Sequence, residues 1–125
     1  MLTDKEIAQQ KLKDSRMLDL LRVCKSDIEQ PHILEHFFYA PDSATANAMV
    51  DEAHQAGYTA SDNHYIYEGK DVWSVMIFTP VTPDENGVNS ESIFMLSLAR
   101  KHGANYDGWG TMMTGDHVSL EHLEE

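Results

Sequence analysis

The sequence contains a single cysteine, Cys24, among its 125 residues. One cysteine excludes an intrachain disulfide and any cysteine-rich zinc site. No apolar run approaches the roughly 18 residues needed to span a bilayer. The first residues, MLTDKEIAQQ, lack the basic start and the apolar stretch of a secretory signal. We therefore expect a cytoplasmic protein without membrane contact, long enough for one domain with a hydrophobic core.

Basic residues are scarce after the first 25 positions. Residues 1–25 hold six of the nine lysines and arginines against four acids, a net charge of +2. Residues 26–125 keep three basic residues against 17 acids, a net charge of −14, so the whole chain carries −12. Such an acidic body repels phosphate backbones and attracts basic partners, although acidity can also serve solubility alone. The charge argues against direct binding to nucleic acid.

The common motifs of catalysis and metal binding are missing as well. No GxGxxG, P-loop, GxSxG or HExxH pattern occurs. His32 and His36 have an i, i+4 spacing, but on a strand this separates them by about 13 Å, too far to share one ion. His64 and Tyr65 are adjacent, and adjacent side chains on a strand point to opposite faces. We therefore expect no catalytic residues, no metal and no cofactor.

The N-terminal residues predict a helix with one apolar stripe. Thr3 and Glu6 have the spacing of a capping box, and no Gly or Pro occurs from Asp4 to about Lys25. The second half carries apolar residues at i, i+3, i+4 and i+7, namely Met17, Leu20, Leu21 and Cys24. The first half is mostly polar. We expect the second half to pack, with the first half free to project.

The rest of the chain alternates strands and helices in the order β-α-β-β-α-β. Strands are expected at 32–40, 58–67, 72–81 and 105–113. One helix is expected from Asp42 or Ser43 to the stop at Gly57. The second is expected from Ser90 to the stop at Gly103, with TPDENGVN before Ser90 as a polar loop.

This order predicts an α+β, ferredoxin-like sandwich with a four-stranded antiparallel sheet and an extra N-terminal helix. Both helices of that plan cover one face, the first and third strands lie in the centre, and the last strand lies on an edge. The expected division is an N-terminal helix and linker at 1–30, the ferredoxin-like domain at 31–113 and an acidic C-terminal tail at 114–125.

The two central strands are apolar on both faces, which this fold does not require. Since burying a glutamate costs more than burying a neutral histidine, we place Leu34, His36 and Phe38 against the helices. Glu35, Phe37 and Tyr39 then face the other way, together with Phe78 of the third strand. This open face is either a binding surface or is covered by the N-terminal helix, a second copy of the chain or a partner protein.

The stretch YDGWG at 106–110 places two glycines in the expected last strand. In a regular strand Tyr106 points to the helices, while Asp107 and Trp109 point to the open face. Glycines in a strand also indicate a bulge or a close approach of another chain. A bulged edge strand with Trp109 in the core is therefore the alternative. The candidate partner-binding residues are Asp107, Trp109, Glu35, Phe37, Tyr39 and Phe78.

Two stretches, LEHFFYAPDSATANAMVDEAHQAGYTASD (34–62) and the closing YDGWGTMM, resemble the regulator of ribonuclease E activity B (RraB) family of bacterial proteins. The resemblance covers most of residues 4–113. It implies a non-enzymatic inhibitor that binds ribonuclease E in its arginine-rich, largely disordered scaffold region and modulates RNA degradation. The tail TGDHVSLEHLEE is shorter and less acidic than in the better-known members.

A second interpretation stays open beside this resemblance. Related domains also occur where the ribonuclease role is not established. The chain would then be a small acidic regulatory or immunity-type binding module with another partner, or a ligand-binding dimer. Self-association through the open face belongs to this second interpretation.

Overall fold

The computed structural model describes residues 2–23, 32–81 and 84–111. Its helices are α1 (Asp4–Val23), α2 (Ser43–Gln55) and α3 (Glu85–His102). Its strands are β1 (His32–Ala40), β2 (Thr59–Tyr67), β3 (Lys70–Val81) and β4 (Asn105–Thr111). Residues 24–30 of the expected N-terminal helix and linker, residues 112–113 of the expected last strand and the tail expected at 114–125 lie outside the described residues.

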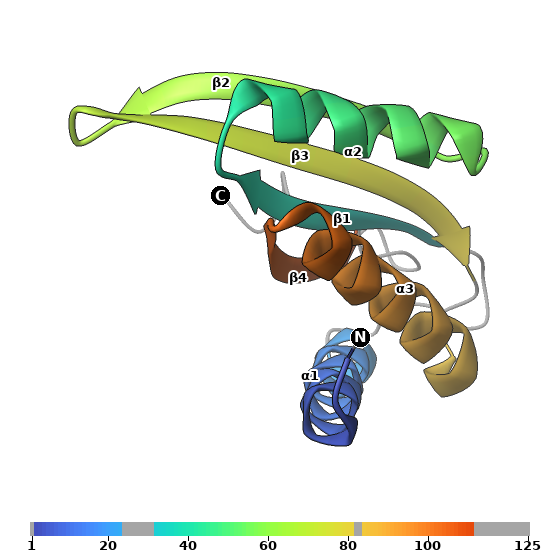
Figure 1. The fold of residues 1–125 in the computed structure, drawn as a ribbon. Coiled ribbons are helices and arrows are strands. Elements are labelled where there is room, and N and C mark those ends of the chain that lie inside the picture. Colours follow the sequence, from blue (N-terminus) through green and yellow to red (C-terminus); the bar gives the residue numbers. More distant parts are fainter. Residues whose placement is uncertain (1, 24–31, 82–83, 112–125) are drawn as a thin grey trace.

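The four strands form one antiparallel sheet in the order β2-β3-β1-β4. This order confirms the ferredoxin-like α+β prediction, with β1 and β3 in the centre and β4 on an edge. Helices α2 and α3 cross the same face of the sheet, and α1 lies beside α3 (Figure 1). The opposite face of the sheet is called the open face below.

The main core lies between the sheet and the two helices α2 and α3. Its buried residues are Phe38, Val75 and Ile77 from the sheet, Ala46, Met49 and Ala53 from α2, and Met95, Leu98 and Ala99 from α3. The face of β1 predicted to meet the helices is therefore confirmed, because Leu34 and His36 are fully buried with Phe38. Alternation along the strand defined the two faces, and the cost of burying Glu35 indicated which of them meets the helices.

His36 is a buried core residue with a partner on each ring nitrogen. Its Nδ1 lies 2.8 Å from the Tyr106 hydroxyl, and its Nε2 lies 3.0 Å from Thr79 Oγ1. Burial raises the pKa of the Tyr106 phenol, which keeps its proton, so we assign Tyr106 as the donor to Nδ1. The Nε2 proton is then donated to Thr79. Burial also lowers the pKa of His36 to about 4, so the ring is neutral.

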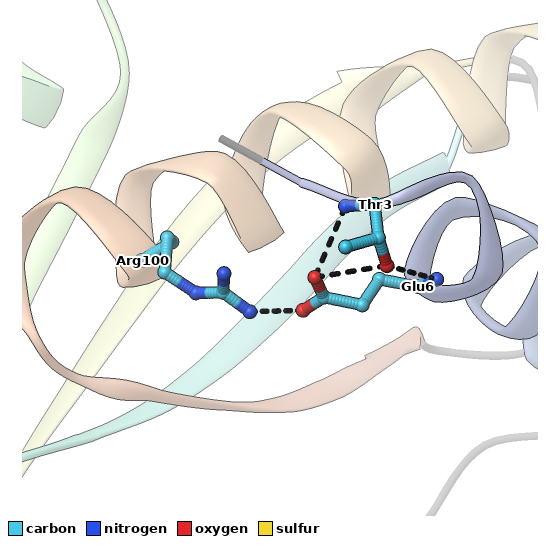
Figure 2. A network of polar contacts seen from close by, with 3 residues as sticks. All are labelled: Thr3, Glu6 and Arg100. Carbon is cyan, nitrogen blue, oxygen red and sulfur yellow. Dashed lines mark hydrogen bonds and ion pairs between the residues drawn. The ribbon is translucent and has the colours of Figure 1, made fainter.

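Helix α1 begins with the predicted capping box (Figure 2). The Glu6 amide donates to Thr3 Oγ1 and the Thr3 amide donates to Glu6 Oε1, each at 3.1 Å. The same carboxylate receives the Arg100 guanidinium of α3 through its second oxygen. The first half of α1 therefore lies against α3 and does not project from the body.

The packing face of α1 agrees with the predicted stripe only in part. Leu21 is buried together with Leu18, and Met17 packs against the same cluster, whereas Leu20 is exposed. Cys24 lies outside the described residues. Two polar side chains, Gln10 and Asp14, are buried on the same side as the leucines. The apolar pattern did not predict these two residues, because polar side chains are buried where other elements supply hydrogen-bond partners.

Helix α3 begins at Glu85, so the loop predicted before Ser90 is wrong over most of its length. Asp84 is the N-cap, and its Oδ1 accepts a 2.7 Å hydrogen bond from the Gly87 amide. Gly87 is a poor helix former, but the cap and the complete burial of Val88 outweigh that preference. The predicted end is confirmed, since Gly103 adopts the left-handed conformation with φ of 68°.

Candidate protein-binding face

A β-bulge in β4 decides which side chains of YDGWG face the helices. In the pairing of β4 with β1, Tyr106 lies opposite Phe38 and Trp109 lies opposite His36. The register shifts between these two pairs, so Asp107 is the additional residue of the bulge. One extra residue reverses the alternation, and both aromatic side chains therefore lie on the helix side of the sheet.

The predicted orientation of Trp109 toward the open face is therefore wrong. Its side chain is only 6% exposed and belongs to a second buried cluster with Leu18 and Leu21 of α1. Gly108 makes the bulge possible, because its φ of 99° is a conformation that residues with a Cβ rarely adopt. The alternative of a bulged edge strand with Trp109 in the core is the arrangement observed.

The buried carboxylate of Asp14 joins α1, α3 and β4. Its Oδ1 accepts hydrogen bonds from Trp109 Nε1 at 2.8 Å and from Gln10 Nε2 at 3.0 Å. Its Oδ2 accepts from the Ser92 hydroxyl of α3. Three donors on three elements compensate for the burial of one carboxylate. The sequence signal for this cluster, Asp14 at helical spacing from Leu18 and Leu21, was missed because the residue is polar.

The open face carries large side chains and no described helix. On β1, Ile33 is 60% exposed and Tyr39 is 40% exposed, while Phe37 is partly buried. Since α1 lies against α3, the expectation that this helix could cover the open face is wrong. The other two occupants named from the sequence, a second copy of the chain and a partner protein, remain as candidates.

Two glycines of β4 lie beside the open-face residues of β1. Gly110 lies opposite Glu35 and Gly108 lies opposite Phe37. A Cβ at Gly110 would lie 3.6 Å from Phe37 Cε2, so the phenyl ring rests beside this backbone. The bulge thus moves Trp109 into the core and places two glycines, which carry no side chain, next to Phe37.

Five of the six sequence-predicted site residues meet on or beside the open face. Glu35 pairs with Phe78 across the two central strands, and Phe37 and Tyr39 follow along β1. Asp107 is exposed in the bulge. The pKa of Tyr39 is raised mainly by the nearby Tyr65 phenol, then by partial burial and by the Asp107 carboxylate, which places these groups close together.

A cavity at one end of this face was missed by the sequence analysis. It has a volume of about 540 Å³ and is lined by Tyr39, Ala40, Tyr65, Tyr67, Asp71 and Val72. Tyr65 and Tyr67 are two residues apart on β2 and therefore share a face. This spacing was a usable sequence signal, but the contribution of β1 to the same cavity follows only from strand pairing.

Comparison with known proteins identifies the family. Residues 11–111 match the profile of the family described as Regulator of ribonuclease activity B. The chain belongs to the RraB family. A relative of that name from Xenorhabdus nematophila is 27% identical over 114 residues, covering 88% of this chain and 80% of the relative. Others are from Actinobacillus succinogenes, 30% identical over 69% of this chain and 62% of the relative, and Salmonella typhi, 25% identical over 88% and 82%.

The RraB family is a family of regulators of ribonuclease activity. The described residues of this member offer no metal centre. Within 2–23, 32–81 and 84–111, no group of three or more His, Cys, Asp or Glu side chains is arranged to hold an ion. None of the described helices is both long and apolar enough to cross a membrane. The candidate binding site of this RraB protein is the open face with the cavity at its end.

Proposed function

We propose that this RraB protein regulates a ribonuclease by binding it through the open face, without catalysis of its own. The observation that carries the proposal is a sheet face that carries large aromatic side chains and no described helix, in a chain that belongs to a family of ribonuclease regulators. Large exposed apolar surfaces on soluble proteins are usually interaction sites. Aromatic side chains are also the residues most enriched in the energetic centres of protein interfaces.

The charge of the sheet indicates a basic partner. The carboxylates on the described strands are Glu35, Asp62, Asp71 and Asp107, and the lysine is Lys70. Glu35 and Asp107 border the aromatic side chains of the open face. A basic segment would be attracted to this face before contact and would retain complementary charges after it. We propose the arginine-rich scaffold region of ribonuclease E as this segment, and the cytoplasm as the place of the encounter.

Direct binding to purified ribonuclease E tests the proposal. The full chain is titrated with the scaffold region at increasing salt, and affinity should fall as charges are screened. The double variant Glu35→Lys and Asp107→Lys reverses the charges of the open face and should weaken binding by about tenfold or more. The matched control is Asp62→Lys, because Asp62 lies opposite the buried Val75 and is exposed on the other side of the sheet.

The outcomes separate this function from its alternative. Binding that is absent, independent of salt or equally weakened by Asp62→Lys would contradict the proposal. A tight dimer in sedimentation, with Phe37 and Tyr39 protected at its interface and no affinity for the ribonuclease, would favour the self-associating module instead.

A further inference from the structure

The β2–β3 hairpin extends past the end of β1 and creates one wall of the tyrosine-lined cavity. Strand β1 ends at Ala40, opposite Trp73, whereas the pairing of β2 with β3 continues to Tyr67 opposite Lys70. Figure 1 shows this hairpin projecting beyond β1 and α2. The cavity lies at this step, and both Tyr39 and Tyr65 line it. We call it the tyrosine cavity.

The aromatic rings of the tyrosine cavity are not used by the core. Tyr65 and Tyr67 are 39% and 62% exposed, and Tyr39 is exposed to a similar degree. Neither core cluster includes any of the three. Aromatic rings carry partial negative charge on their faces, which attract cations within about 6 Å of the ring centre. Three such rings around one hollow favour a positively charged occupant.

One carboxylate, that of Asp107, adds to this negative potential. Asp71 also lines the cavity, but strand alternation places its side chain on the face opposite to Tyr65 and Val72, where its Oδ1 lies 2.9 Å from His64 Nε2. Asp107 lies close enough to Tyr39 to raise the pKa of its phenol, although the nearby Tyr65 phenol has the larger effect. None of the described residues that line the cavity is basic. The aromatic faces and the charges therefore favour the same type of ligand.

We propose that the tyrosine cavity binds the guanidinium group of an arginine side chain on the protein partner. The proposal rests on the proposed function for its protein partner, and it adds the chemistry and the place of recognition. A guanidinium is planar, stacks on aromatic rings and is more weakly hydrated than an ammonium, so arginine fits this cavity better than lysine. The volume of about 540 Å³ accommodates the side chain together with neighbouring backbone.

Peptide titrations followed by NMR test the chemistry directly. The probe is a blocked peptide of glycine and serine with arginine at its centre, added to the full chain. Two matched peptides carry lysine or citrulline instead, since lysine keeps the charge and citrulline keeps the planar shape. The arginine peptide should shift the amide signals of Tyr39, Tyr65 and Val72. Lysine should bind several-fold more weakly, and citrulline should leave these signals in place.

Two substitutions of one tyrosine separate stacking from folding. Tyr65→Phe retains the ring and should retain binding, whereas Tyr65→Leu should weaken it by about tenfold. Ile66→Ser is the control, because Ile66 is 69% exposed on the same strand but does not line the cavity. Equal binding by Tyr65→Leu and Tyr65→Phe, equal shifts with citrulline, or shifts that map elsewhere on the chain would overturn the proposal.

The same variants distinguish this site from the broader function. Ribonuclease binding that is unaffected by Tyr65→Leu would reject the cavity and leave the proposed function standing. Arginine-peptide binding without any affinity for ribonuclease E would retain the cavity and reject that partner. If the Tyr39 and Tyr65 signals instead shift with protein concentration alone, a second copy of the chain occupies the cavity and the proposal is wrong.

Discussion

The indole N–H of Trp109 donates to the buried carboxylate of Asp14 across 2.8 Å. This bond joins the last described strand to the first helix, which lie 95 residues apart in the sequence. It also explains why the tryptophan of YDGWG does not face a partner. A buried indole requires an acceptor, and the acceptor lies on the helix side of the sheet.

Substitution of Asp14 should be strongly destabilising. Asp14→Ala leaves the donors of Trp109, Gln10 and Ser92 without their acceptor, and we expect a loss of about 3 kcal/mol in the free energy of unfolding. Asp14→Asn retains one acceptor oxygen and should cost less. Urea unfolding measures both. The control Lys11→Ala, on the exposed side of α1, should stay within about 0.5 kcal/mol of the parent.

The stability of the protein should fall as the pH decreases below the ordinary pKa of histidine. His36 has a pKa of about 4 in the folded protein, whereas the ordinary pKa of histidine is 6.5. As the pH falls, the unfolded chain therefore binds the proton before the folded protein does. The contribution of neutral His36 to the free energy of unfolding is complete above pH 6.5 and is lost as the pH falls toward 4. Between pH 8 and pH 5 we expect a loss of about 2 kcal/mol from this residue.

Urea unfolding at several pH values, compared with the His36→Gln variant, isolates this effect. The variant lacks the titrating ring and should show a flatter dependence over this range, even if it is less stable overall. Glu91, whose pKa is raised by burial, is common to both proteins and cancels in the comparison. Parallel pH profiles for the two proteins would show that His36 does not control the dependence.

The two glycines of β4 should respond differently to alanine. Gly108 has a φ of 99°, so Gly108→Ala introduces backbone strain of about 1–2 kcal/mol although the space around it is open. At Gly110 the φ is ordinary and the new methyl would lie 3.6 Å from Phe37 Cε2, a normal contact. Gly110→Ala should therefore be nearly neutral. Thermal unfolding of the pair measures the difference, and equal losses would argue against the bulge.

Much of the sheet and its helices followed from local rules. Alternation, together with the cost of burying Glu35, placed Leu34, His36 and Phe38 toward the helices. The element order predicted the strand order. The capping box of α1 and the end of α3 at Gly103 were also predictable, because each depends on residues within a few positions of one another. The open face follows from the same alternation, with Glu35, Phe37 and Tyr39 as predicted.

Tertiary structure alone decided where α1 packs and which way Trp109 points. The side chain of Asp14 is buried because its donors come from Ser92 and Trp109, far away in the sequence. Asp107 is one extra residue in β4, and a single extra residue moves every side chain beyond it to the opposite face of the sheet. The tyrosine cavity likewise depends on tertiary structure, because it forms where β2 and β3 extend beyond the end of β1. The sequence by itself therefore determined the elements, their order and the apolar faces. The register, the bulge and the long-range hydrogen bonds decided which of those faces became core and which stayed open.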